Sequence, residues 1–474
     1  MRKQKKQVIL EKIRVEDYAA EGRSLARVEG KVVFIEGAVP GDMVDIRLSK
    51  NKSDWAEGQA IRIHEYSADR VEPFCEHFGV CGGCQWQMLP YEKQLQYKHK
   101  QVNDNLTRIA RIPLPEISPI IGADQTRHYR NKMEYTFATG KYIPDEEFRR
   151  MKAEDSFPEN QPGAAGFHVR GFFDKVVEIN TCHLQEEPTN LIRKAVAAFA
   201  IENGLPFYNI RQHEGWLRNM IVRNSTPGEL MVNLVLGYED EKFRVQLLDQ
   251  MLQQFPQITT LLYTINSKKN DSLTGLEPQT YSGKGYIEEK LEDFRFVISP
   301  KSFFQTNTRQ AEKLYNITRD YAGLTGKEVV YDLYCGTGSI GIFVSKGAKK
   351  IVGVEVVDDA IVDARKNAAL NNINHASFFT GDVTDICDDA FFETHGRPDV
   401  VITDPPRAGM HEKLVKKLLD IAAPTVVYVS CNPATQARDL QLLAEKYSVE
   451  KIQPVDMFPH TLHIENVVQL KLND

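Results

Sequence analysis

Cys431 lies in the tetrapeptide Ser430-Cys431-Asn432-Pro433, directly after the run TVVYV (425–429), which predicts a strand. A thiolate at this position could add to carbon 6 of uracil and convert the unreactive carbon 5 into an enolate carbon that attacks a methyl donor. A general base must then remove the proton from carbon 5. Taken alone, Cys431 could equally be an inert buried thiol, so the residue type leaves both interpretations open.

A glycine-rich turn follows another predicted strand in the segment 332–341, DLYCGTGSIG. Its glycines allow the backbone to approach a ligand and to open a helix. The turn itself fits a dinucleotide, S-adenosylmethionine or no ligand at all. Glu355 ends the next predicted strand, 19 positions after Gly336, which is the spacing at which an acid accepts hydrogen bonds from ribose hydroxyls. The pair therefore favours a cofactor that contains adenosine.

Two further carboxylates follow the next predicted strands. Asp382 stands in GDV, where it could meet an adenine, and Asp404 opens the hexapeptide DPPRAG. Each could instead cap a helix. Three acids at successive strand ends favour a cofactor site, because the carboxyl ends of parallel strands share one edge of the sheet.

The elements that must position these residues follow from hydrophobic periodicity. Repeated strand, turn and helix units over 301–474 predict a doubly wound, Rossmann-like α/β domain. Residues 1–67 contain short alternating runs that predict a small β-barrel, with five strands as the simplest count. Residues 68–300 mix strands with helical patterns and predict an α+β domain, in which the polar stretch 153–163 is expected to be a loop.

The amino-acid composition is typical of a globular protein without membrane-spanning helices. The 474 residues are 42% hydrophobic and 26% charged, and no stretch approaches the roughly 20 apolar residues of a membrane helix. The basic N-terminus lacks the apolar region of a secretory signal, so we expect a cytoplasmic protein. A net charge of −6 argues against nucleic-acid binding, but residues 93–132 carry eight Lys and Arg against three acids. That local excess is typical either of phosphate binding or of a solvated helix face.

Seven cysteines, an odd number, are unevenly spread, which favours metal binding or catalysis over a disulfide framework. Cys75, Cys81 and Cys84 lie in one short loop with Gly82 and Gly83 between the last two. A fourth ligand could come from the distant Cys182. This spacing alone does not separate zinc from an iron–sulfur cluster, or either from cysteines without a metal.

Three motifs together resemble the bacterial RNA 5-methyluridine methyltransferase family: DPPRAG (404–409), SCNP (430–433) and DMFPHTLHIEN (456–466). The resemblance implies S-adenosylmethionine as methyl donor, Cys431 as the nucleophile and Glu465 as the base. It also implies cofactor contacts, and at one of them, Ser339, some relatives carry Asn. These contacts are Gln305, Tyr334, Ser339, Glu355, Asp382 and Asp404.

Other segments extend the resemblance over nearly the whole chain. Ribosomal members of the family hold a 4Fe-4S cluster with the C-x5-C-x2-C pattern and one distant cysteine, which implies Cys75, Cys81, Cys84 and Cys182, with zinc as the alternative. The N-terminal segment 1–67, which contains EGRSLARVEGKVVFIEGAVPGD (21–42), resembles the TRAM domain, a small RNA-binding barrel. The segment HYRNK (128–132) resembles a motif of the central domain whose cations could hold phosphates while the target base is flipped out.

The resemblance implies methylation of a uridine in 23S ribosomal RNA, and a monomer is the simplest expectation for an enzyme whose partner is a large RNA. Since a TRAM domain and a cluster also occur in some enzymes that act on tRNA, a tRNA uracil-C5-methyltransferase is the first alternative. An amino-group methyltransferase using DPP would need neither Cys431 nor Glu465. An iron–sulfur RNA-binding assembly factor without activity is the alternative from another class.

Overall fold

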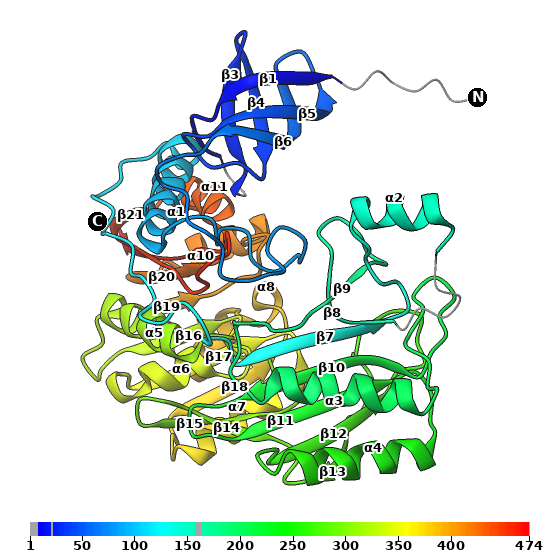
Figure 1. Cartoon of the computed structure of the whole chain (residues 1–474). Coiled ribbons are helices and arrows are strands. Elements are labelled where there is room, and N and C mark those ends of the chain that lie inside the picture. Colours follow the sequence, from blue (N-terminus) through cyan, green and yellow to red (C-terminus); the bar gives the residue numbers. More distant parts are fainter. Residues whose placement is uncertain (1–7, 20–21, 157–162, 474) are drawn as a thin grey trace.

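A computed structural model describes residues 8–19, 22–156 and 163–473, which form three large sheets and a small hairpin (Figure 1). The N-terminal sheet stands at one end of the molecule, and the other two lie side by side at the other end. No helix in the described ranges has both the length and the apolarity needed to cross a bilayer.

The N-terminal sheet has the strand order β1-β5-β6-β4-β3-β2 and encloses its own apolar core. Alternation explains its faces, since Val33 and Ile35 are buried while their neighbours in β4 are not. The all-β expectation is confirmed, with a sixth strand that is too short to show alternation in the sequence. The strands are β1 (Ile9–Arg14), β2 (Asp17–Tyr18), β3 (Ser24–Val28), β4 (Lys31–Glu36), β5 (Met43–Asn51) and β6 (Trp55–Glu65).

The central sheet has the order β13-β12-β11-β10-β7-β8-β9, and helices α3 and α4 share its core. The predicted α+β character is confirmed. The helices are α2 (Asp145–Glu154), α3 (Thr189–Glu202) and α4 (Glu241–Gln254). The strands are β7 (Lys132–Ala138), β8 (Ala164–His168), β9 (Val176–Glu178), β10 (Leu217–Asn224), β11 (Leu230–Leu236), β12 (Thr260–Ile265) and β13 (Gln279–Ser282). Helix α2 covers the start of the stretch predicted as a loop, and residues 157–162 of that stretch lie outside the described residues.

The C-terminal sheet has the order β18-β17-β16-β19-β20-β22-β21, in which β22 alone runs antiparallel to both its neighbours. The strand order reverses direction at β16, so the carboxyl ends of β16 and β19 flank the position where such folds bind ligands. The strands are β16 (Val329–Leu333), β17 (Lys350–Glu355), β18 (Ala376–Thr380), β19 (Val400–Thr403), β20 (Thr425–Ser430), β21 (Tyr447–Val455) and β22 (Glu465–Leu472). The helices are α5 (Thr308–Ala322), α6 (Ser339–Val344), η3 (Ser345–Gly347), α7 (Asp358–Leu370), α8 (Val383–Ile386), α9 (Asp389–His395), α10 (Glu412–Ile421) and α11 (Pro433–Leu443).

Segments from the middle of the chain share cores with the C-terminal sheet. Helix α1 (Tyr91–Asn105) and the π-helical turn η2 (Leu106–Ala110) pack beside α11 (Figure 1). The hairpin of β14 (Ile287–Leu291) and β15 (Phe294–Ile298) packs into the same domain. The division at 67 and 300 stays a prediction, and these contacts show that the chain before 300 helps to build the C-terminal unit.

Candidate active site

Cys431 lies where β20 ends and α11 begins. The Asn432 side chain accepts a hydrogen bond from the Ala434 amide at 3.1 Å, and Pro433 opens the helix. Both features favour a helix start and keep the strand from continuing. In the antiparallel pairing of β20 with β22, Ser430 lies opposite Asn466. Glu465, the first residue of β22, therefore lies at the edge where Cys431 leaves the sheet.

Cys431, Glu465 and Asp404 form one electrostatic unit. Burial, followed by the charges of Glu465 and Asp404, raises the pKa of the Cys431 thiol to about 11, while Arg407 lowers it. Burial and Asp404 hold the pKa of Glu465 well above its usual range, and burial raises the pKa of Asp404 to about 7. The predicted nucleophile and base are thus brought together beside the DPPRAG motif. Carboxylates with raised pKa are suited to accepting a proton near neutral pH.

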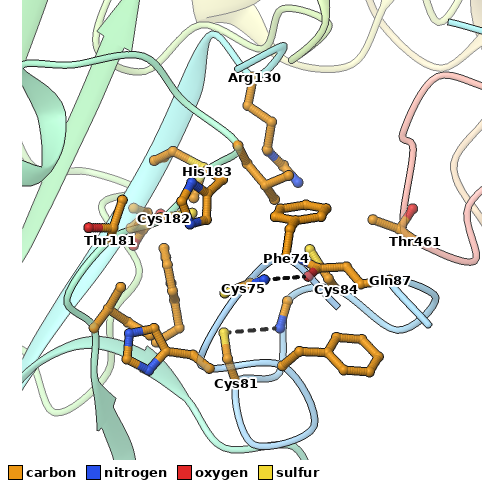
Figure 2. Close-up of a pocket in the computed structure, with 18 of the residues that line it drawn as sticks. Phe74, Cys75, Cys81, Cys84, Gln87, Arg130, Thr181, Cys182, His183 and Thr461 are labelled. Carbon is orange, nitrogen blue, oxygen red and sulfur yellow. Dashed lines mark hydrogen bonds between the residues drawn. The ribbon is translucent and has the colours of Figure 1, made fainter. Parts of the chain in front are cut away.

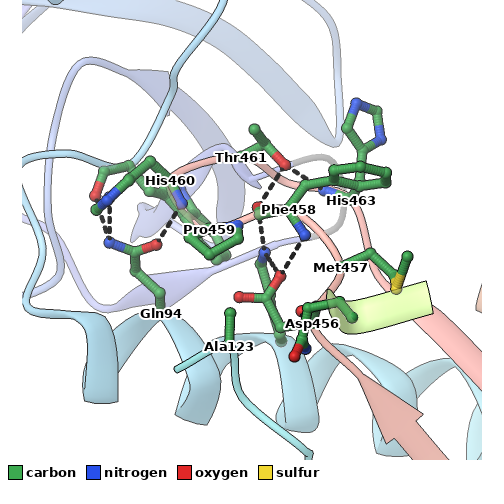
Figure 3. A network of polar contacts seen from close by, with 12 residues as sticks. Gln94, Ala123, Asp456, Met457, Phe458, Pro459, His460, Thr461 and His463 are labelled. Atoms are coloured by element: carbon green, nitrogen blue, oxygen red, sulfur yellow. Dashed lines mark hydrogen bonds and ion pairs between the residues drawn. The ribbon is translucent and has the colours of Figure 1, made fainter. Parts of the chain in front are cut away.

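The loop that leads into Glu465, residues 456–464, is held by helix α1 from the other half of the chain. Lys98 Nζ lies 2.6 Å from Asp456 Oδ1, and both side chains are fully buried. The Tyr91 hydroxyl donates to Asp456 Oδ2 at 2.8 Å. Gln94 accepts a hydrogen bond from the His460 amide at 2.8 Å (Figure 3). We expect this network to determine where β22, and hence Glu465, begins.

The cysteine-containing loop reaches the same segment. The amides of Gln85 and Trp86, just after Cys84, donate to the His460 carbonyl at 2.8 and 3.1 Å. His460 adopts a positive φ of 65°, a conformation that few residues with side chains adopt without outside support. The 456–464 loop is therefore supported both by α1 and by the cysteine loop.

Lys98 is one of the cations in the basic stretch 93–132, for which phosphate binding and a solvated helix face were the two interpretations. Neither interpretation applies to Lys98. Its side chain is buried against Asp456, so it neither contacts phosphate nor lies on a solvated helix face. Sequence reasoning missed the pair, because a buried lysine in a polar helix looks like any other cation. The one available signal was the acid that opens the DMFPHT motif.

Two carboxylates accept hydrogen bonds from backbone amides of the glycine turn. Asp332 is buried in β16 and accepts a hydrogen bond from the Gly341 amide at 2.8 Å. Glu355 accepts one from the Gly336 amide at 3.3 Å. Gly336 and Gly338 have φ values of 52° and 75°, which glycine adopts without the penalty that a Cβ brings. The glycine turn and Glu355, the last residue of β17, thus lie in contact.

Of the other predicted cofactor residues, Tyr334 and Ser339 belong to this turn, and Asp382 lies beside it. Burial and the charges of Asp382 and Glu355 raise the pKa of Tyr334, so its hydroxyl lies within their electrostatic reach. Asp382 also caps α8, accepting the Thr384 amide at 2.8 Å, so its helix-cap role is realised. The Ser339 hydroxyl is hydrogen-bonded to the Tyr315 hydroxyl at 2.9 Å.

Gln305 is almost completely buried, and its segment is held by the HYRNK motif. The Asn131 side chain donates to the Gln305 carbonyl at 2.9 Å and to the Thr308 hydroxyl at 2.8 Å. The Arg130 guanidinium lies 5.7 Å from the ring centroid of Phe458 in the 456–464 loop. The motif therefore positions two parts of the site.

Comparison with known proteins assigns the chain to a family. Residues 280–473 match the family model described as tRNA (Uracil-5-)-methyltransferase, and residues 8–61 match the TRAM domain. An uncharacterized RNA methyltransferase of Bacteroides thetaiotaomicron is 51% identical over 96% of this chain and all of its own length. One from Porphyromonas gingivalis is 47% identical over 97% of this chain and 99% of its own. The chain belongs to the RNA uracil-5-methyltransferase family.

The same comparisons bear on the fold of this RNA methyltransferase. The crystal structure of Pyrococcus abyssi tRNA (uracil-54, C5)-methyltransferase in complex with S-adenosyl-L-homocysteine covers 97% of this chain and 100% of its own, with a TM-score of 0.73 and 27% identity. The resemblance read from the sequence motifs, the TRAM domain at the N-terminus and the enzyme class are confirmed.

In this methyltransferase, the four predicted cysteine ligands line one cavity of ≈ 250 Å³ (Figure 2). Cys75, Cys81 and Cys84 come from the loop before α1, and Cys182 comes from the segment after β9. All four are free and partly exposed. No three His, Cys, Asp or Glu side chains in the described parts of the chain are arranged to hold a single metal ion. The cavity has room for a group larger than one ion, and its donor set is the one that iron–sulfur clusters use.

Proposed function

We propose that this methyltransferase transfers a methyl group from S-adenosylmethionine to carbon 5 of a uridine in 23S ribosomal RNA. Cys431 acts as the nucleophile and Glu465 as the general base. The observation that carries the proposal is the position of Cys431, Glu465 and Asp404 close together at one edge of the C-terminal sheet. Uracil methylation requires such a pair of thiol and carboxylate, whereas methylation of an amino group does not.

The cofactor would lie over the glycine turn. Glu355 would accept hydrogen bonds from the ribose hydroxyls, and Asp382 would meet the adenine. When bound, S-adenosylmethionine supplies an electrophilic methyl group and leaves as a neutral thioether. The full set of residues proposed to contact it is Gln305, Tyr334, Ser339, Glu355, Asp382 and Asp404.

The protein's own residues carry the remaining steps. Cys431, whose thiol pKa is raised to about 11, must first lose its proton to solvent. The resulting thiolate uses an electron pair to bond to carbon 6 of uracil, and the C5=C6 electron pair moves onto the carbonyl at carbon 4 to give an enolate. Carbon 5 then forms its bond to the methyl group. Glu465 removes the proton from carbon 5, which restores the double bond and expels the thiolate with its electron pair. Because burial raises the pKa of Glu465, its carboxylate form is a stronger base than an exposed glutamate, provided that the group has lost its proton.

A tRNA is the second candidate substrate. The combination of a TRAM domain with a cysteine cluster favours ribosomal RNA by analogy within the family. The structural likeness to the Pyrococcus abyssi enzyme, which extends over 97% of this chain and whose name specifies uracil-54 of tRNA, favours tRNA. We retain 23S ribosomal RNA as the proposal, together with action in the cytoplasm as a monomer.

We also propose that Cys75, Cys81, Cys84 and Cys182 hold a 4Fe-4S cluster that supports the fold, with zinc as the alternative. The cavity of ≈ 250 Å³ that these side chains line supports a polynuclear group. Protein purified without oxygen should contain about four irons per chain and absorb visible light through thiolate-to-iron charge transfer. Cys182→Ser should remove both signals, and stoichiometric zinc without iron would contradict the cluster.

The decisive experiment measures 5-methyluridine by mass spectrometry in separated ribosomal and transfer RNA. The cells either lack the gene, or lack it and carry the wild-type chain or Cys431→Ala. Loss from ribosomal RNA, restored by wild type alone, supports the proposal. Loss of 5-methyluridine from tRNA alone supports tRNA as the substrate. Unchanged 5-methyluridine in both pools contradicts the uracil chemistry, and rescue of any other methylation by Cys431→Ala indicates an amino-group methyltransferase.

A further inference from the structure

The hairpin of β8 and β9 exposes two adjacent phenylalanines at its tip. Phe172 and Phe173 are 53% and 63% exposed. The turn that carries them depends on Gly171, which has a φ of 82°, and the Phe172 amide donates to the Val169 carbonyl at 3.0 Å. Large apolar side chains that are held at a surface by an ordered turn mark an interaction site more often than isolated exposed ones do.

A broad hollow of ≈ 630 Å³ lies between this tip and the cysteine loop. Gly82 and Gly83 form one wall, and Phe167 and residues 168–173 form the other. The Gly82 amide donates to the His168 carbonyl at 3.0 Å, and a Cβ at Gly82 would lie 2.8 Å from that oxygen. The close approach requires glycine at position 82, and it holds the cysteine loop directly against the hairpin.

Basic side chains lie near the exposed rings of Phe172 and Phe173. The Arg211 guanidinium lies 5.3 Å from the ring centroid of Phe173 and forms a 2.6 Å ion pair with Asp174. Arg170 is exposed beside the turn, and Lys175 is partly exposed after it. Within residues 170–175, the two cations outnumber the single acid, and Arg211 adds a third. Aromatic faces with flanking arginines are the combination that binds unpaired nucleotides, because the rings stack on bases while the cations attract phosphates.

We propose that this hollow binds an unpaired nucleobase of the substrate RNA, stacked on Phe172 and Phe173, with the adjoining phosphate held by Arg170 and Arg211. The inference rests on the proposed RNA substrate and adds a contact outside the reacting site. Cys431 and Glu465 belong to the C-terminal sheet, whereas this hollow belongs to the central sheet and the cysteine loop. The hydrogen bond from Gly82 to His168 links the tip to that loop, so the cysteine loop positions the stacking surface.

The test uses the full-length protein purified without oxygen and a fluorescently labelled RNA with a single-stranded uridine-containing loop. The Kd of the protein–RNA complex is measured by fluorescence anisotropy at a fixed salt concentration. The double variant Phe172→Ala/Phe173→Ala should bind about tenfold more weakly or worse, whereas Phe172→Tyr/Phe173→Tyr should restore binding, because tyrosine keeps the stacking face. Tyr238→Ala removes an aromatic side chain of similar exposure elsewhere and should leave the Kd unchanged.

Arg170→Ala should weaken binding and reduce the slope of log K against log salt by about one. Melting temperatures equal to that of wild type exclude a folding defect. Unchanged affinity of the alanine pair, or an equal loss in the tyrosine pair, would overturn the stacking site. Formation of 5-methyluridine by wild type on the same RNA is measured separately. If no 5-methyluridine forms while RNA binding still depends on Phe172 and Phe173, the proposed reaction is contradicted but the nucleobase site is supported.

Discussion

The buried ion pair of Lys98 and Asp456 makes a quantitative prediction about stability. Both side chains are fully buried, with Nζ 2.6 Å from Oδ1, and Lys98 also donates to the Phe458 carbonyl at 3.1 Å. Burial lowers the pKa of Lys98, as expected for a charge removed from water. In Lys98→Met the Asp456 carboxylate keeps only neutral donors, the Tyr91 hydroxyl and the Phe458 amide.

Removing one partner of a buried pair leaves an uncompensated charge and costs about 3–5 kcal/mol. The matched control is Lys100→Met, two residues along the same helix. Lys100 lies 2.9 Å from both Asp17 and Asp104, but 43% of its side chain is exposed, so its loss should cost less than about 1 kcal/mol.

The assay is urea unfolding followed by tryptophan fluorescence, in which Trp86 reports on the packing beside α1. The midpoint of Lys98→Met should fall well below that of wild type, while Lys100→Met should stay close to it. Lys98→Met should also slow methylation at saturating substrate, because the loop before Glu465 loses its anchor. Equal midpoints for the two variants would refute the argument that burial sets the strength of this pair.

Three further predictions concern the reacting groups. Cys431→Ala should reduce 5-methyluridine formation by at least about a thousandfold, and activity within tenfold of wild type in a radiolabelled methyl-transfer assay would exclude it as nucleophile. Glu465→Gln should accumulate a covalent protein–RNA adduct that survives a denaturing gel, because the thiolate cannot leave until carbon 5 loses its proton; rapid turnover without adduct would contradict the role of the base. Asp404 has a pKa of about 7 in the fold, against about 3.9 in the unfolded chain, so it lowers the stability of the cofactor-free protein as pH rises through 7. Asp404→Asn should therefore raise the melting temperature more at pH 8 than at pH 6, and an equal rise at both would refute the shift.

Local patterns in the sequence were sufficient for the elements of the catalytic domain. Periodicity and glycine turns mark β16, β17, β19 and β20, because parallel strands buried on both faces read as apolar runs. The ribose contact predicted for Glu355 stays a prediction, and the structure places its carboxylate against the Gly336 amide. The motifs around 404, 431 and 465 likewise predicted a set of side chains for one reaction, and the structure places Cys431, Glu465 and Asp404 close together.

Only the tertiary structure decided how those side chains meet. Cys431 and Glu465 are 34 positions apart, and they share an edge because β22 inserts antiparallel between β20 and β21, a pairing that no local pattern encodes. The same holds for Lys98, which looks like a surface cation until a residue 358 positions away is packed against it. Composition and periodicity determine which segments form strands and helices, since those preferences act over a few residues. Burial of a charge, and the raised pKa of a carboxylate, depend on neighbours that only the folded chain brings into contact.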